Sequence, residues 1–168
     1  MGQGVNTKIA QVASITLGID PSRIKLHSTN TSRVANTSPT AASSGADLNG
    51  HATRIACQAL IKRLLGLASR IYRKPVKNLS IVGEQLHAEG VPIGLKWEEL
   101  IQKAYLERIQ LTENGHYATP LIYFDAKTSK GHPFAYHVYG LAVLTARLDC
   151  IRGTYVFERV GIVHDFGT

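Results

Sequence analysis

The sequence predicts an α+β fold in which helices pack on one face of a mixed or antiparallel sheet. Three stretches carry apolar residues at three- and four-residue spacing, which is the period of an amphipathic helix. The last third of the chain is instead rich in Val, Ile, Leu and Tyr, residues that favour strands. At 168 residues the chain has the size of one domain or of two small lobes, and no repeat of fixed period is visible.

The first half of the chain contains two predicted helices. Apolar residues on one face predict a helix over residues 7–17, which Gly18 is placed to end. Alternating apolar and polar residues over 24–28 predict a half-buried strand. A longer helical pattern then covers residues 46–72, and Pro75 closes it.

The second half opens with loose alternation over residues 79–86, which predicts one further strand. Pro92 and Gly94 predict a break in the chain after this strand. Apolar residues at helical spacing begin again at Trp97 and predict a third helix.

The last third of the chain predicts a long hairpin. Residues 121–124 form a short candidate strand, and two longer strand-like runs follow at 136–148 and 154–165. The five residues 149–153 between these runs suit a hairpin loop in which Gly153 takes a positive φ. We therefore expect the two longer runs to pair.

Composition argues against a membrane or secreted protein. No apolar run approaches the roughly 20 residues that a membrane-spanning helix needs, and residues 1–6 do not resemble a secretory signal. We therefore expect a cytoplasmic protein that does not bind a membrane.

The net charge of +7 leaves open a basic module that binds nucleic acid. A solvated helix face explains the densest basic stretch at least as well, because charged side chains normally point outward. This stretch has one aromatic residue, too few for the stacking that single-strand binders use, so we expect no nucleic-acid partner. Its basic residues are Lys62, Arg63, Arg70, Arg73, Lys74 and Lys77.

Common catalytic and metal motifs are missing from the sequence. Cys57 and Cys150 are the only cysteines, which is too few for a disulfide framework or a zinc site. The seven histidines show no metal-ligand spacing. The sequence also contains no nucleophile elbow, P-loop or dinucleotide fingerprint. We therefore assign no catalytic residue and no metal ligand.

Two segments could contact a ligand. Residues 1–4, Met-Gly-Gln-Gly, stand directly before a helix, where free backbone N–H groups attract anions and the Gln3 amide can both donate and accept. Residues 36–50 combine small and hydroxylated side chains and run into the long helix, as a cofactor wall requires. A flexible end and an ordinary helix-capping loop remain alternative explanations.

The two segments, at this separation, resemble the molybdopterin-binding subunit of xanthine dehydrogenases and the related aldehyde oxidases. The long Ser/Thr/Ala stretch favours the xanthine branch, with an aldehyde oxidase-type protein as the alternative. The resemblance covers essentially the whole chain and continues downstream through Trp97-Glu98-Glu99, Ala104-Tyr105, Gly131-His132-Pro133-Phe134, Tyr139-Gly140, Asp149-Cys150 and His164-Asp165-Phe166-Gly167.

The resemblance implies hydroxylation of a purine such as hypoxanthine or xanthine, with oxygen taken from water at a molybdenum-molybdopterin cofactor. FAD and [2Fe-2S] clusters would lie in other parts of the enzyme. Ala41 and Ala42 would line the molybdenum and substrate pocket. The full set of implied cofactor-binding residues is Met1, Gly2, Gln3, Thr40, Ala41, Ala42, Ser43 and Ser44.

Two features of the family are missing from this chain. Its general-base glutamate lies in a Gly-Glu-Pro motif, and its substrate-binding arginine precedes the Met-Gly-Gln-Gly motif; neither occurs here. We therefore expect residues 1–168 to be one partial molybdopterin-binding domain, truncated at both ends and inactive alone. Its partners would be a purine substrate and the remaining domains or subunits of a homo-oligomeric or heteromeric dehydrogenase.

Overall fold

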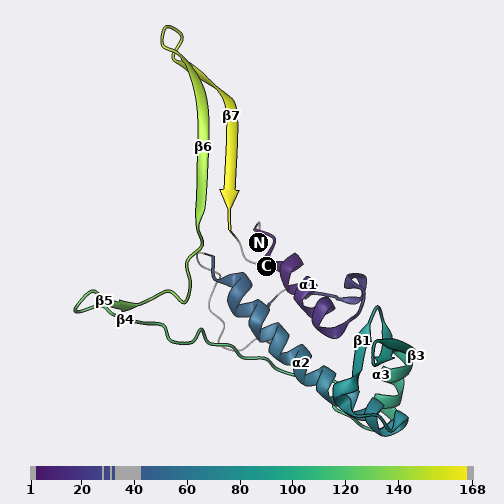
Figure 1. Ribbon diagram of the computed structural model, residues 1–168. Helices are drawn as coiled ribbons and strands as arrows, with labels where there is room; N and C mark the ends of the chain where they lie inside the picture. Colours follow the sequence, from purple (N-terminus) through teal and green to yellow (C-terminus); the bar gives the residue numbers. More distant parts are fainter. Residues whose placement is uncertain (1–2, 28, 31, 33–42, 166–168) are drawn as a thin grey trace. The chain divides into compact units, whose positions relative to one another are not determined.

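The computed structural model describes residues 3–27, 29–30, 32 and 43–165. The chain divides into two compact units, Met1–Ala118 and Thr119–Thr168. Figure 1 shows helices and a small sheet in the first unit, and two hairpins in the second. The α+β class predicted from the sequence is confirmed, and every strand pair in the described residues is antiparallel.

The first unit begins with two helices, which are separated by a short 3-10 helix and the residues that follow it. Helix α1 covers Val5–Leu17 and helix α2 covers Gly45–Tyr72, close to the predicted ranges. Gly18 ends α1 as predicted, with a φ of 70° and its N–H directed at the carbonyls of the last turn. A side chain at Gly18 would also collide with the next strand, because an added Cβ would lie 2.7 Å from the carbonyl carbon of Ile81.

A three-stranded sheet follows α2, with the order β1-β2-β3. Its strands are β1 (Leu79–Val82), β2 (Gln85–Ala88) and β3 (Val91–Lys96). The single strand predicted over 79–86 is wrong, because a turn at Gly83 and Glu84, both at positive φ, folds this segment into a hairpin.

The break predicted at Pro92 and Gly94 is also wrong, because both residues lie inside β3. Among the described strands, β3 pairs with β2 alone and is therefore an edge of the sheet. A proline is tolerated at an edge because one side of the strand makes no ladder hydrogen bonds.

The third helix, α3, covers Trp97–Leu106 as the sequence predicted. The Glu99 carboxylate accepts a hydrogen bond from the Lys96 N–H at 3.0 Å and so satisfies a free donor at the helix start. Helices α2 and α3 bury one apolar core with the sheet, made of Leu64, Leu67, Ala68, Leu79, Leu86, Ala88, Leu95, Leu100 and Ala104.

The strand predicted over residues 24–28 is wrong for its described part. Residues 24–27 pair with no strand of the described chain, and Ser28 lies outside the described residues. A short 3-10 helix, η1 (Pro21–Arg23), precedes this segment, and a second, η2 (Val76–Asn78), precedes β1. The Arg23 guanidinium forms ion pairs with Glu84 and Glu98, which anchor η1 to the sheet and to α3 in place of strand pairing.

The Arg23–Glu84 pair predicts a loss of stability in acid. Hydrogen bonds from Arg23 and from the Asp20 backbone N–H hold the pKa of Glu84 below its ordinary value of 4.5. A lowered folded-state pKa stabilises the fold above that value, and this stabilisation is lost as the pH falls through the folded pKa. We expect the Glu84→Gln variant to melt lower than the parent chain near neutral pH and to lose less of its melting temperature between about pH 6 and about pH 3.

Thermal unfolding followed by circular dichroism across this pH range measures the effect. Glu107→Gln, which replaces an exposed glutamate just after α3, is the control and should follow the parent chain. If the melting temperatures of the parent chain and of Glu84→Gln fell by the same amount over this pH range, the ion pair would not stabilise the first unit.

Two antiparallel hairpins form the second unit. Strands β4 (Tyr123–Asp125) and β5 (Lys130–His132) make the shorter one, with β4 slightly later than the predicted strand. Strands β6 (Gly140–Asp149) and β7 (Thr154–His164) make the longer one and confirm the predicted pairing. Gly153 has a φ of 66°, as the predicted loop requires.

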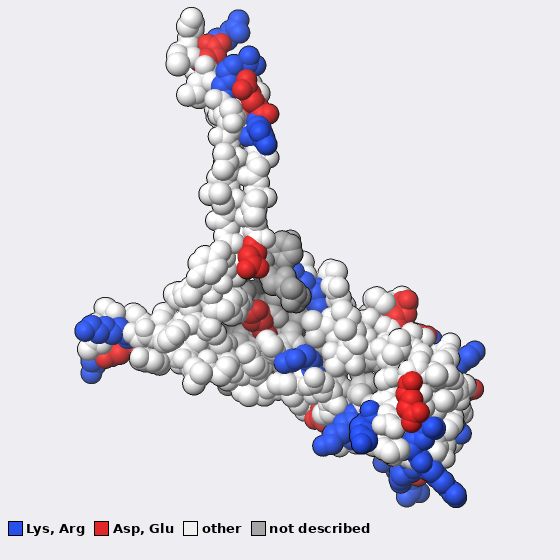
Figure 2. All heavy atoms as spheres, viewed as in Figure 1, with Lys and Arg blue, Asp and Glu red and all other residues white. Residues whose placement is uncertain are grey.

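The basic residues after the middle of α2 lie on a solvated surface. Lys62, Arg70, Arg73 and Lys77 are exposed, and Figure 2 shows Lys and Arg gathered where α2 and α3 end. Of these, Arg70 and Arg73 lie at the carboxyl end of α2, where the helix dipole favours cations. Within the described residues, none of the helices is long and apolar enough to cross a membrane.

Candidate cofactor site

The start of α1 is open to a ligand. Gly4 is the N-cap, with a φ of 73°, and apart from its two chain neighbours no described residue lies within 4 Å of where its Cβ would be. Its carbonyl accepts the first helical hydrogen bond, from the Lys8 N–H at 3.1 Å. The earlier N–H groups of this turn have no partner within the helix, and Gln3 stands exposed directly before them. This end therefore presents donors and an amide to solvent.

The start of α2 has similar backbone geometry but a different charge. Ser43 and Ser44 are exposed, and the Ser44 carbonyl accepts from the Leu48 N–H at 3.0 Å. Asp47 lies in the first turn, where a carboxylate stabilises the positive end of the helix dipole. The first turn of α1 contains no acidic residue, so an anion would meet less repulsion there.

The two helix starts lie at the same end of the helix pair. Gly50 of α2 is buried, and a Cβ there would be 3.9 Å from both Ile9 Cδ1 and Val12 Cγ2 of α1. At the other end, Gly18 packs on β1, which also contacts the α2 helix. The end of α2 packs on β1 through Leu64, Leu67 and Ala68, so the helices run in the same direction. The contact lies about 6–10 Å along α1 and about 8 Å along α2 at 1.5 Å per residue.

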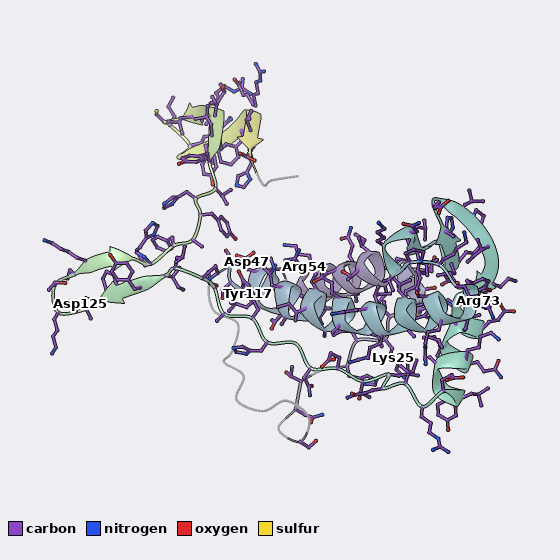
Figure 3. The ribbon with its side chains drawn as sticks, turned by 60° about the horizontal axis from the view of Figure 1, so that its bottom comes forward. Lys25, Asp47, Arg54, Arg73, Tyr117 and Asp125 are labelled. Atoms are coloured by element: carbon purple, nitrogen blue, oxygen red, sulfur yellow. The ribbon has the colours of Figure 1, made fainter. Side chains whose placement is uncertain are left out.

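An extended segment after α3 returns along α2 to the same end. Arg63 of α2 donates to the Glu113 carboxylate at 2.7 Å and to the Thr112 carbonyl at 3.0 Å. Further along, the rings of His51 and Tyr117 stack with centroids 4.4 Å apart. Figure 3 shows Tyr117 beside the first half of α2, close to Arg54.

Gly115 lets this segment approach α2 closely. An added Cβ would lie 2.8 Å from the carbonyl carbon of Ala52, and closer still to its oxygen, and 3.2 Å from the Ala56 nitrogen. No side chain fits between these two backbones, so only glycine allows the approach. Gly115 therefore holds Tyr117 near the start of α2.

Comparison with known protein families shows which family the chain belongs to. The family model described as "Molybdopterin cofactor-binding domain" matches residues 1–168. The chain belongs to the molybdopterin cofactor-binding domain family.

Two curated relatives carry this molybdopterin cofactor-binding domain within longer chains. The chain is 40% identical over 168 residues to xanthine dehydrogenase/oxidase of Gallus gallus, covering all of this chain and 11% of that protein. It is 37% identical over 165 residues to aldehyde oxidase 2 of Macaca fascicularis, covering 98% of this chain and again 11% of the relative. The chain thus spans about a tenth of these relatives.

The fold is also found in a solved enzyme. The crystal structure of quinoline 2-oxidoreductase from Pseudomonas putida 86 matches 99% of this chain and 21% of that chain, with a TM-score of 0.74 and 20% identity. In that protein the whole fold of this chain, both hairpins included, is one part of a chain about five times longer.

The molybdopterin-binding residues predicted from the sequence fall into two groups. Gln3, Ser43 and Ser44 are described, and they lie at the starts of the two parallel helices. Met1, Gly2, Thr40, Ala41 and Ala42 lie outside the described residues.

The described residues at this end suit a cofactor with a phosphate and a heterocycle. Backbone N–H groups at a helix start bind phosphate oxygens, and a glutamine amide pairs with the edge of a heterocycle. No group of three or more His, Cys, Asp or Glu side chains in the described parts of the chain could hold a bare metal ion.

Sequence reasoning missed the His51–Tyr117 pair beside this surface. Neither residue belongs to a motif, and only the fold of the 107–118 segment along α2 brings them together. The only signal for the close approach of this segment to α2 was the glycine at position 115, and glycines in loops are too common to predict such a contact.

Proposed function

We propose that this chain forms one wall of the molybdopterin site in a cytoplasmic xanthine dehydrogenase-type enzyme that hydroxylates hypoxanthine or xanthine. The observation that carries the proposal is the shared end of α1 and α2 in a chain of this family. Met1, Gly2, Gln3, Thr40, Ala41, Ala42, Ser43 and Ser44 are the proposed contacts.

The chain's own groups have distinct parts in this proposal. The N–H groups at the start of α1 would bind the phosphate of the cofactor, because that turn has no acidic residue. The Gln3 amide would orient the pterin through paired donor and acceptor bonds. When bound, the cofactor supplies the molybdenum redox chemistry that adds a water-derived oxygen to the substrate.

Other parts of the enzyme would complete the reaction. The chain's two cysteines, Cys57 and Cys150, are too few for the four ligands of an iron-sulfur cluster, so [2Fe-2S] and FAD would bind outside residues 1–168. An aldehyde oxidase-type activity is the alternative, because the macaque relative shares 37% identity. Steady-state rates of the full-length protein with xanthine and with an aromatic aldehyde separate the two.

We expect Gln3→Ala in the full-length protein to lower cofactor occupancy. Loss of one or two hydrogen bonds to the cofactor weakens binding by about tenfold. Molybdenum by elemental analysis and pterin by fluorescence, each per mole of protein, measure the change after dialysis. Gln11→Ala is the matched control, because Gln11 is exposed on the same helix but two turns from its start.

Equal cofactor content in the two glutamine variants would contradict the role of Gln3. The 168-residue chain alone should show no xanthine oxidation and no stoichiometric molybdenum, because a cofactor pocket needs groups converging from several elements. Stoichiometric molybdenum in that chain would mean that residues 1–168 hold the whole site.

A further inference from the structure

The β6–β7 hairpin has two unlike faces. Its register alternates side chains between them, and one face is apolar from the Ala142–Ile162 pair to the Leu148–Tyr155 pair, with Gly140 and His164 at its open end. The rings of Tyr155 and Phe157 contact edge-on with centroids 5.2 Å apart, which confirms that both residues lie on this face. We call it the continuous face; it consists of Ala142, Leu144, Ala146, Leu148, Tyr155, Phe157, Val160 and Ile162.

The second face changes character halfway along the hairpin. Near the open end it carries Leu141, Val143 and Val163, which are apolar and exposed. A bulge follows Thr145, and beyond it Arg147 pairs with Glu158 at 3.3 Å. Figure 2 shows the same division, with charged residues at the outer end of the hairpin and an uncharged shaft.

This pattern is typical of a strand pair in which one face is buried along most of its length and the other face is buried only near the open end. Strands covered on both faces are apolar on both, whereas strands with one solvated face alternate apolar with polar residues. The hairpin by itself leaves these apolar side chains exposed, with Leu148 69% and Ile162 68% accessible. An isolated two-stranded hairpin is marginally stable in water, and apolar patches of this kind mark interaction surfaces.

We propose that segments of the full-length polypeptide outside residues 1–168 cover the whole continuous face and the open-end half of the second face. The charged outer half of the second face stays in solvent. The partner surface is apolar and comes from the same polypeptide, because the solved oxidoreductase contains this entire fold within a chain of which it makes up only 21%. Among the described strands β6 and β7 pair only with each other, so their outer backbone edges also suit added strands.

Thiol labelling of single-cysteine variants tests this division. Leu148→Cys probes the outer end of the continuous face, Arg147→Cys the outer end of the second face, and Val143→Cys its open-end half. Leu148 and Arg147 are adjacent in sequence and similarly exposed in this chain: Leu148 is 69% exposed and the Arg147 side chain 73%. Cysteine is a small, nearly apolar residue and disturbs packing little.

Each variant is made with Cys150→Ser, because Cys150 is exposed and would react beside the probes. Burial raises the pKa of the Cys57 thiol, so this native cysteine reacts slowly and can stay. Peptide mass spectrometry follows each probe in the full-length protein and in the 168-residue chain.

In the full-length protein we expect the Arg147→Cys probe to react freely and the Leu148→Cys and Val143→Cys probes to react about 100-fold more slowly, because a covered thiol reacts only after local opening. All three should react freely in the 168-residue chain. Equal rates for the Leu148→Cys and Arg147→Cys probes in the full-length protein would overturn the proposal.

Two further outcomes would assign the cover elsewhere and so also overturn it. Slow reaction of the Leu148→Cys probe already in the 168-residue chain would mean that Met1–Ala118 covers the hairpin. Protection that disappears on dilution to a monomer, checked by light scattering, would mean that a second copy covers it. Because no step involves the cofactor, the outcome is independent of the proposed molybdopterin site.

Discussion

Replacing Gly115 by alanine is expected to destabilise the first unit of this chain. The new Cβ would lie 2.8 Å from the Ala52 carbonyl carbon, between two backbones that cannot yield as a flexible side chain can. Overpacking of this kind typically costs about 1–3 kcal/mol, and a backbone contact belongs at the upper end. We expect the 168-residue chain to melt about 4–12 °C lower.

Gly66→Ala is the control for this substitution. Gly66 lies inside α2, and no described atom outside the helix backbone lies within 4 Å of where its Cβ would be. Alanine there should stabilise the helix by about 0.5–1 kcal/mol, because it lowers the entropy lost on folding. The two glycine-to-alanine changes therefore have opposite predicted signs, and thermal unfolding followed at the helical circular dichroism signal reads both. A Gly115→Ala chain as stable as Gly66→Ala would mean that residues 107–118 do not pack on α2.

The second large effect is expected at Gly50, where α1 and α2 touch. An alanine Cβ fits, since its nearest neighbours would be Ile9 and Val12 at 3.9 Å, an ordinary van der Waals distance. A leucine does not fit and would push the two helices apart near their starts. Because positioning errors of about 1 Å can reduce function about 100-fold, we expect Gly50→Leu to remove most cofactor from the full-length protein.

Molybdenum content per mole of folded protein measures this effect, with Gly50→Ala as the matched control that keeps its cofactor. The core between α2, α3 and the sheet does not include Gly50, so Gly50→Leu should still fold there. Full molybdenum in Gly50→Leu would argue that the spacing of the two helix starts does not matter for cofactor binding.

Local patterns predicted the helices and the long hairpin well. Helical spacing suffices for α1, α2 and α3, because each helix buries one face against neighbours whatever their identity, and a terminal glycine adds the end of α1. The β6–β7 pair was predictable because two long strand-like runs flank a loop that ends in Gly153. These features depend on residues close in sequence.

Errors arose where a distant contact decides the local structure. Residues 24–27 alternate like a strand, but they pair with no described strand, and the neighbouring Arg23 binds Glu84 and Glu98. Pro92 was read as a break, although the edge position of β3 tolerates it. For the candidate site, motifs indicated Gln3, Ser43 and Ser44, whereas the stacking of His51 on Tyr117 depends on a chain path that no motif encodes.

Amide hydrogen exchange in the full-length protein, with and without bound molybdopterin, tests the central claim most directly. The account predicts that the cofactor slows exchange at residues 4–8 and 45–48, the starts of α1 and α2, and leaves residues 69–72 at the end of α2 unchanged. Unchanged exchange at both helix starts, with protection appearing elsewhere in residues 1–168, would contradict it.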